Sequence, residues 1–229
     1  MVGTEWLYVT DKVKKMDEKK LIDDLTKDLK PVKTVPCCLT RLCLWLPVVL
    51  FFILGFVYFK GLRTDFESLL TTSFMLESLL LFLSGLLAAM AAFKLSIPDT
   101  RLRLPVITLL TIPTFVWLGL NVYSYIMSAG SNIMAEVHNH ERFENEIFLL
   151  IFMVTLPATV LFYLIAKAAP TFRAWTAYAI ILATASFGAI AVRMICGFDG
   201  YAHLLIYHFL PVIMLSVLGL ALGRFLLRW

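Results

Sequence analysis

The sequence predicts an all-α membrane protein, a bundle of six transmembrane helices with a short cytoplasmic N-terminal amphipathic helix. Of its 229 residues, 60% are hydrophobic and 16% are charged, and the mean hydropathy is +0.85, well outside the range of ordinary soluble domains. Six apolar runs are long enough to cross a bilayer, which takes about 20 residues of helix. The basic residues are also distributed unevenly along the chain. Little of the chain remains for a folded soluble domain.

The first 41 residues precede the first apolar run and form the first predicted domain, with residues 42–229 as the transmembrane domain. They contain no short apolar core after a basic start and no small-residue cleavage site, so they do not predict a secretory signal peptide. We expect this segment to remain attached to the bundle and to bind a partner.

An amphipathic helix is predicted inside this segment, in the stretch MDEKKLIDDLTKDLKPV. Leu21, Ile22, Leu25 and Leu29 fall at i, i+1, i+4 and i+8, which places them on one helical face. Pro31 favours a helix end just before it. An isolated helix of about 14 residues is marginal in water, so its apolar stripe needs a surface to pack against.

Three surfaces are available to this stripe. The bilayer is one, although Asp23, Asp24 and Asp28 oppose attraction to anionic lipid. The cytoplasmic loops of the same protein are the second. The third is a groove on a partner protein, a common way to bind an amphipathic helix.

The transmembrane domain is predicted from six apolar runs. Small residues four apart, in the pairs Gly85 with Ala89, Ala185 with Ala189 and Gly219 with Gly223, predict close helix packing. The runs are Leu42 to Phe59, Phe74 to Phe93, Leu104 to Met127, Ile147 to Ala166, Ala174 to Ile195 and Leu204 to Leu227.

The distribution of Lys and Arg predicts the orientation, because cytoplasmic loops are enriched in these residues. With six spans, 16 of the 20 basic residues fall on the side of the two termini, so both termini are predicted to be cytoplasmic. The net charge of +4 therefore reflects topology. No patch of interleaved aromatic and basic residues indicates direct nucleic-acid binding.

Several short motifs together carry a resemblance to a known family. These are LIDDLTKDLKPV at residues 21–32, LSIP at 95–98, the LP pair at 156–157, YHFLP around His208, and the closing GRFLLRW. In this order and spacing the chain resembles the NrsF-type family, named for negative regulation of sigma F. The resemblance implies a bacterial inner-membrane anti-sigma factor. Its N-terminal segment would hold an extracytoplasmic-function sigma factor away from RNA polymerase until an envelope signal releases it.

A polar cluster is predicted where ionisable residues gather at the outer ends of the spans. Glu77 and Arg193 lie at similar predicted depth, with Cys196, Asp199, His203 and His208 near the same outer ends. Charges inside a membrane are costly and usually pair in the bundle interior, so we expect an ion pair between Glu77 and Arg193 with His208 close by. Both a structural clamp and a signal-sensing pocket fit this pattern.

The outer loop EVHNHERFENE offers a possible metal site at His138 and His140, since imidazole suits zinc, nickel or copper. The HxH spacing is not helical, and such residues are ordinary in a polar loop. We therefore expect a solvated loop, no metal and no cofactor. Members of the resembled family can carry two outward cysteines linked to heavy-metal sensing. Cys196 matches one, but Glu144-Asn145-Glu146 stands where the other is expected.

Catalysis finds no support in the sequence, since HExxH, GxSxG and P-loop motifs are all missing. We therefore expect a regulator and not an enzyme. The alternative is a small transporter or ion-handling membrane protein whose N-terminal helix docks on its own loops. The two hypotheses differ in where the activity lies. A regulator would act through residues 1–36, and a transporter through the cluster around Glu77, Arg193 and His208.

Overall fold

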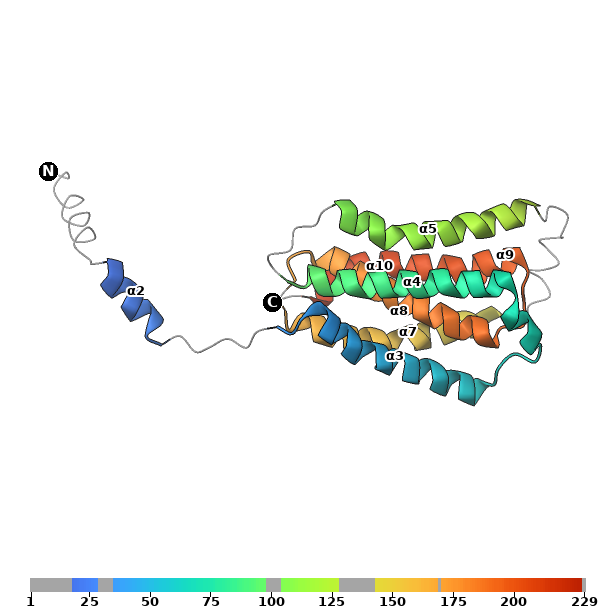
Figure 1. Ribbon diagram of the computed structural model, residues 1–229, viewed down its shortest axis with the longest axis horizontal. Coiled ribbons are helices and arrows are strands. Elements are labelled where there is room, and N and C mark those ends of the chain that lie inside the picture. Colours follow the sequence, from blue (N-terminus) through green and yellow to red (C-terminus); the bar gives the residue numbers. More distant parts are fainter. Residues whose placement is uncertain (1–17, 29–34, 98–103, 128–142, 169, 228–229) are drawn as a thin grey trace. The chain divides into compact units, whose positions relative to one another are not determined.

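The structure is a computed structural model that describes residues 18–28, 35–97, 104–127, 143–168 and 170–227. Every regular element within these ranges is helical, in agreement with the predicted all-α class (Figure 1). The chain divides into two compact units, residues 1–35 and 36–229, which are considered separately.

The first unit contains helix α2 (Glu18–Thr26). The Thr26 hydroxyl donates a hydrogen bond to the Ile22 carbonyl oxygen at 2.8 Å, in the last turn of the helix. Leu21, Ile22 and Leu25 are exposed on α2, whereas Leu29 lies outside the described residues. The described helix is shorter than the predicted one, which extended to the residue before Pro31.

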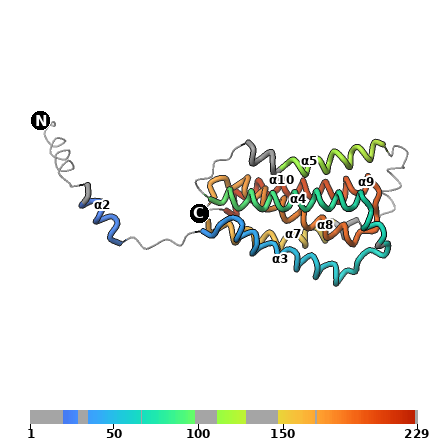
Figure 2. Tube along the Cα trace, viewed as in Figure 1, coloured from blue at the N-terminus to red at the C-terminus, as the bar shows by residue number. Residues whose placement is uncertain are grey.

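The second unit is a bundle of long helices that run along a common axis (Figure 2). Within the described residues, five helical segments are long and apolar enough to cross a membrane: 38–60, 72–95, 147–166, 173–195 and 201–226. The predicted run at residues 104–127 also forms a helix of 24 residues, and the count of six spans stays a prediction. The long helices are α3 (Cys38–Lys60), α4 (Thr72–Leu95), α5 (Leu104–Met127), α7 (Phe143–Ala166), α8 (Arg173–Ile195) and α10 (Leu210–Leu226).

Short helical elements join the long helices at one end of the bundle, which we call the α8–α9 end. They are η1 (Phe66–Leu70), α9 (Tyr201–His203) and the π-helical segment η2 (Leu204–Phe209). The predicted span from Leu204 to Leu227 is helical in its described residues, and its first residues form a π-helix that leads into α10.

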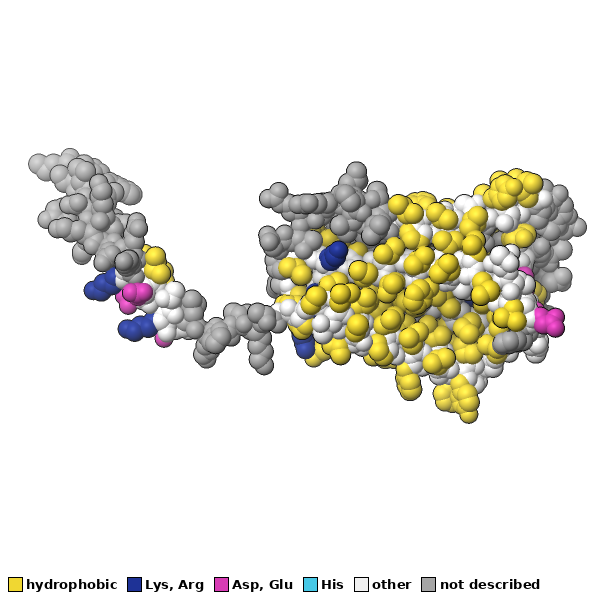
Figure 3. Space-filling view, viewed as in Figure 1, with side chains coloured by type: hydrophobic (Ala, Val, Ile, Leu, Met, Phe, Trp, Pro, Cys, Tyr) yellow, Lys and Arg dark blue, Asp and Glu magenta, His cyan; other side chains and the backbone are white. Residues whose placement is uncertain are grey.

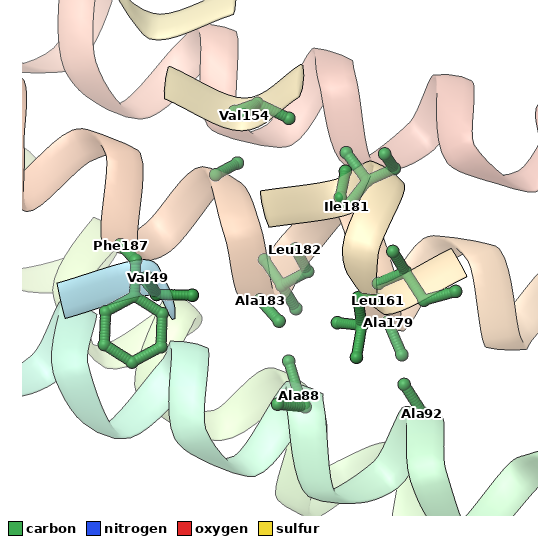
Figure 4. Close-up of a cluster of buried hydrophobic side chains, with 14 of the residues drawn as sticks. Val49, Ala88, Ala92, Val154, Leu161, Ala179, Ile181, Leu182, Ala183 and Phe187 are labelled. Carbon is green, nitrogen blue, oxygen red and sulfur yellow. The ribbon is translucent and has the colours of Figure 1, made fainter. Parts of the chain in front are cut away.

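Helix α8 forms the centre of the bundle and contacts α4, α10 and α7 extensively. Its small residues allow this close approach, as predicted. Ala179 and Ala183 of α8 face Ala92 and Ala88 of α4, with Phe187 packed in the same cluster (Figure 4). All five side chains are buried, and so are most residues of α8.

Helix α10 packs so closely on α8 that two of its positions have no room for a side chain. A Cβ at Gly219 would lie 3.0 Å from the Ala177 carbonyl oxygen. At Gly223 it would lie 2.8 Å from the Ala177 Cβ and even closer to the Arg173 carbonyl oxygen. Since backbone atoms cannot move aside easily, these glycines set the distance between the two helices.

Replacing Gly223 by alanine is expected to destabilise the bundle by about 1–3 kcal/mol, the cost of overpacking a core. The matched control is Gly55→Ala in α3, where no atom lies within 4 Å of the new Cβ. There the substitution should stabilise the helix by up to about 1 kcal/mol, the difference in helix propensity. Thermal unfolding of the two detergent-purified variants checks the opposite signs. Equal unfolding temperatures of the two variants would contradict the close packing of α10 on α8.

The surface of the bundle is largely apolar along its length (Figure 3). On α3, Phe51, Tyr58 and Phe59 are 80%, 84% and 86% exposed. Large aromatic side chains in such numbers on the outside would be costly in water but are stable against lipid. The bundle is therefore compatible with a membrane environment.

The turn after α3 places the residues that follow it next to the end of α8. Gly61 has a φ of 83°, a left-handed conformation that glycine adopts without steric cost. Its N–H donates to the Val57 carbonyl oxygen and closes the helix. The turn directs the next residues back toward the end of α8, where the Arg63 N–H donates to the Met194 carbonyl oxygen at 3.3 Å.

Candidate functional site

The predicted ion pair between Glu77 and Arg193 is present in the structure. The Arg193 Nε lies 3.1 Å from the Glu77 Oε2, and both side chains are buried. The Trp117 indole N–H donates to the other carboxylate oxygen of Glu77 at 3.3 Å. The pair joins α4 to α8, and the indole connects it to α5. A buried carboxylate thus has both a cation and a neutral donor, which offsets part of its desolvation cost.

Arg193 also belongs to a longer chain of charges at the α8–α9 end. Its Nη2 lies 2.5 Å from Asp199 Oδ1, and its Nη1 donates to the Phe198 carbonyl oxygen. Asp199 Oδ2 lies 2.7 Å from Arg63 Nη2, which also lies 2.8 Å from Asp65. We call Glu77, Arg193, Asp199, Arg63 and Asp65 the charge network.

The two aspartates of the network lie outside the long helices, and their surroundings favour the ionised form. Hydrogen bonds from the Arg63 guanidinium hold the pKa of Asp65 well below its usual range. Burial opposes ionisation of Asp199, but hydrogen bonds from Arg63 and Arg193 outweigh it and lower the pKa of that carboxyl. Both aspartates are therefore negative at neutral pH, and they pair with the guanidinium groups of Arg63 and Arg193.

Sequence reasoning missed Arg63, Asp65 and Trp117. Arg63 is 1% exposed at its side chain, although it follows an apolar run at a position where basic residues usually face water. Its partner Asp199 is 136 residues away in the chain. The one local signal was the pair Arg63 and Asp65, two residues apart just after Gly61, which indicates an ion pair. The pairing of Arg63 with Asp199 depends on the tertiary structure.

A cavity of about 470 Å³ adjoins the network. It is lined by charged, aromatic and apolar side chains from α4, α5, α8 and the segment that follows α8. Glu77, Arg193 and Asp199 of the network reach its wall, together with Trp117 and Asn121. The arrangement provides both signs of charge and hydrogen-bonding groups in a partly enclosed space, which suits a small polar ligand.

Cys196 and His208 lie in a second polar group beside the network. The Cys196 Sγ is 3.3 Å from the His203 Nε2, and the rings of His203 and His208 are 5.2 Å apart between centroids. All three side chains are buried. We call these three residues the thiol–imidazole cluster. The two weak metal candidates from the sequence, His138 and His140, lie outside the described residues.

The family model described as negative regulator of sigma F matches residues 25–229, which covers most of the chain. Comparisons with curated proteins and with solved structures found no match. The family match confirms the resemblance carried by the motifs of the sequence. The chain therefore belongs to the NrsF family, a family of negative regulators of sigma F.

Proposed function

We propose that this protein is an anti-sigma factor of the bacterial inner membrane, with six spans and both termini in the cytoplasm. Its N-terminal segment, up to residue 41, binds an extracytoplasmic-function sigma factor and keeps it from RNA polymerase. The input is an envelope signal received at the α8–α9 end of the bundle. Release of the sigma factor is the output.

The exposed apolar stripe of α2 is the observation that supports this proposal most directly. Leu21, Ile22 and Leu25 are 41%, 57% and 67% exposed, although their spacing gives a continuous apolar face. The helix belongs to a compact unit separate from the bundle. An apolar helix face in water is stabilised when it enters a groove on a partner, and the family description supplies the sigma factor as that partner.

The charge network supports a role for the α8–α9 end as the input. The network holds one arrangement through its three buried members, Glu77, Arg193 and Arg63, and loss of one partner of the buried Glu77–Arg193 pair leaves the other with an unpaired charge. The adjacent cavity offers a ligand access to Glu77, Arg193 and Asp199. A ligand or ion that favours a second arrangement can therefore shift the bundle between two states.

A pull-down from detergent-solubilised membranes tests the proposed function. The intact chain is compared with a version that lacks residues 1–36, and co-purified proteins are identified by mass spectrometry. A sigma factor should be recovered with the intact chain and lost with the truncated one. If both proteins are equally well inserted and neither recovers a sigma factor, the anti-sigma function is wrong, and transport or ion handling by the bundle becomes the function to test.

A further inference from the structure

We propose that the thiol–imidazole cluster of Cys196, His203 and His208 is a binding site for a divalent transition-metal ion of the zinc type. The ligand atoms of the three side chains all lie within 4.8 Å of one another. Around a tetrahedral zinc ion, with Zn–S near 2.3 Å and Zn–N near 2.0–2.1 Å, neighbouring donor atoms are about 3.3–3.6 Å apart. The distance of 3.3 Å between the Cys196 Sγ and the His203 Nε2 is close to this spacing.

The π-helical segment η2 brings the two histidines together. In an α-helix, residues five positions apart point about 140° away from each other, because each turn takes 3.6 residues. His203 and His208 are five positions apart, and at this spacing α-helical geometry would separate them. In η2 the hydrogen bonds run from residue i to i+5, as from the Leu210 N–H to the Leu205 carbonyl oxygen. The wider turn places the rings 5.2 Å apart.

The chemistry of the donor set indicates which ion it selects. A thiolate with two imidazoles suits zinc and other borderline ions, whereas magnesium and calcium prefer oxygen ligands. Three protein ligands leave one coordination position for water, unlike the closed four-ligand sites that only stabilise a fold. The cluster therefore fits an ion that can be gained and lost. It does not need a second cysteine, and its three ligands do not include His138 or His140.

An ion bound by the cluster would be linked to the charge network through the segment between Cys196 and His203. Cys196 ends α8, and His203 lies in α9, so an ion bound to both would tie together the two ends of the segment between them. That segment carries Asp199, which is paired with Arg193 and Arg63. Use of the ion as the releasing signal rests on the proposed function, whereas the metal site does not.

The site is tested with the full-length protein purified in detergent and stripped of metal with a chelator. Zn²⁺ should bind with a stoichiometry of one per chain and raise the unfolding temperature, because it binds the folded state. Co²⁺ in the same site should give visible absorption of a tetrahedral ion and a sulfur-to-metal charge-transfer band. The band reports a cysteine ligand directly.

Matched variants then assign the ligands. Cys196→Ser should remove the charge-transfer band, and His208→Asn should weaken Zn²⁺ binding more than about tenfold, since loss of even an outer partner of a ligand costs about 10–100-fold. Cys43→Ser, an exposed cysteine in α3, is the control for the thiol and should change nothing. The double variant His138→Ala/His140→Ala should also keep the band.

Two results would overturn the metal site. One is a folded wild-type protein that binds no stoichiometric Zn²⁺ or shows no charge-transfer band with Co²⁺. The other is unchanged metal binding in both Cys196→Ser and His208→Asn; if one of these fails to fold, the other decides. Recovery of the sigma factor is measured on the same preparation. A protein that binds zinc but no sigma factor contradicts only the proposed function, and the reverse contradicts only the metal site.

Discussion

Replacing Ile22 and Leu25 together by aspartate is expected to abolish recovery of the sigma factor with the solubilised protein and to raise expression of its target genes. Each apolar side chain buried in a partner groove is worth about 1.5–3 kcal/mol. Loss of two therefore weakens binding by about 100-fold or more, at about 1.4 kcal/mol for each factor of ten. Burying a new carboxylate adds to that cost. Co-purification and a reporter for the target genes give the two measurements.

The control for this variant is Lys27→Asp, in the turn that directly follows α2. Lys27 is exposed and directly follows Thr26, the last residue of α2, so it is not part of the apolar stripe. This single change alters the net charge by the same two units as the double variant. If Lys27→Asp releases the sigma factor as strongly, charge and not the apolar face controls binding. Unchanged recovery with Ile22→Asp/Leu25→Asp, at normal protein levels, would rule out α2 as the contact.

Replacing Arg193 by leucine is expected to destabilise the folded bundle by about 3–5 kcal/mol, the usual cost of leaving one partner of a buried ion pair alone. Glu77 would then remain buried beside Trp117 without its cation. Asp199 would keep Arg63, and its side chain is 49% exposed, so water compensates that loss. Thermal unfolding in detergent and protein abundance in membranes measure the effect.

The double variant Glu77→Leu/Arg193→Leu separates a lost ion pair from lost packing. Because it leaves no unpaired buried charge, it should recover much of the stability lost in Arg193→Leu. Lys60→Leu, an exposed basic residue at the end of α3, is the surface control and should change the unfolding free energy by less than about 0.5 kcal/mol. A double variant as unstable as the single one would mean that the ion pair is not the cause.

The long helices were predictable because each apolar run carries its own signal. A helix satisfies its backbone hydrogen bonds within one segment, so length and hydropathy suffice to predict it without knowledge of its neighbours. The close approach of α10 to α8 followed from Gly219 and Gly223 for a similar reason, since a small residue at regular spacing indicates contact with some other helix. Which helix it is does not follow from the spacing. Only the structure identifies α8 as the partner.

The candidate site was predictable in part. The pairing of Glu77 with Arg193 followed from their similar depth, because a charge inside the membrane needs an opposite charge nearby. Arg63 was not predicted, because an arginine at the end of a span usually faces water or lipid headgroups. Its burial depends on the turn at Gly61 and on Asp199, which lies in the segment that follows α8 and pairs with Arg63.

Four properties were predictable from the sequence alone: the helical class, the apolar segments, the amphipathic stripe at Leu21, Ile22 and Leu25, and the family. These are local properties, which composition and a period of 3.6 residues express directly. The meeting of His203 and His208 beside Cys196, by contrast, is seen only in the folded protein. Their spacing of five places them on different faces of an α-helix, and the π-helix that brings them together has no comparable periodic signal in the sequence. The pairing of Arg63 with Asp199 likewise depended on how the helices pack, because the two residues share no helix and no local pattern.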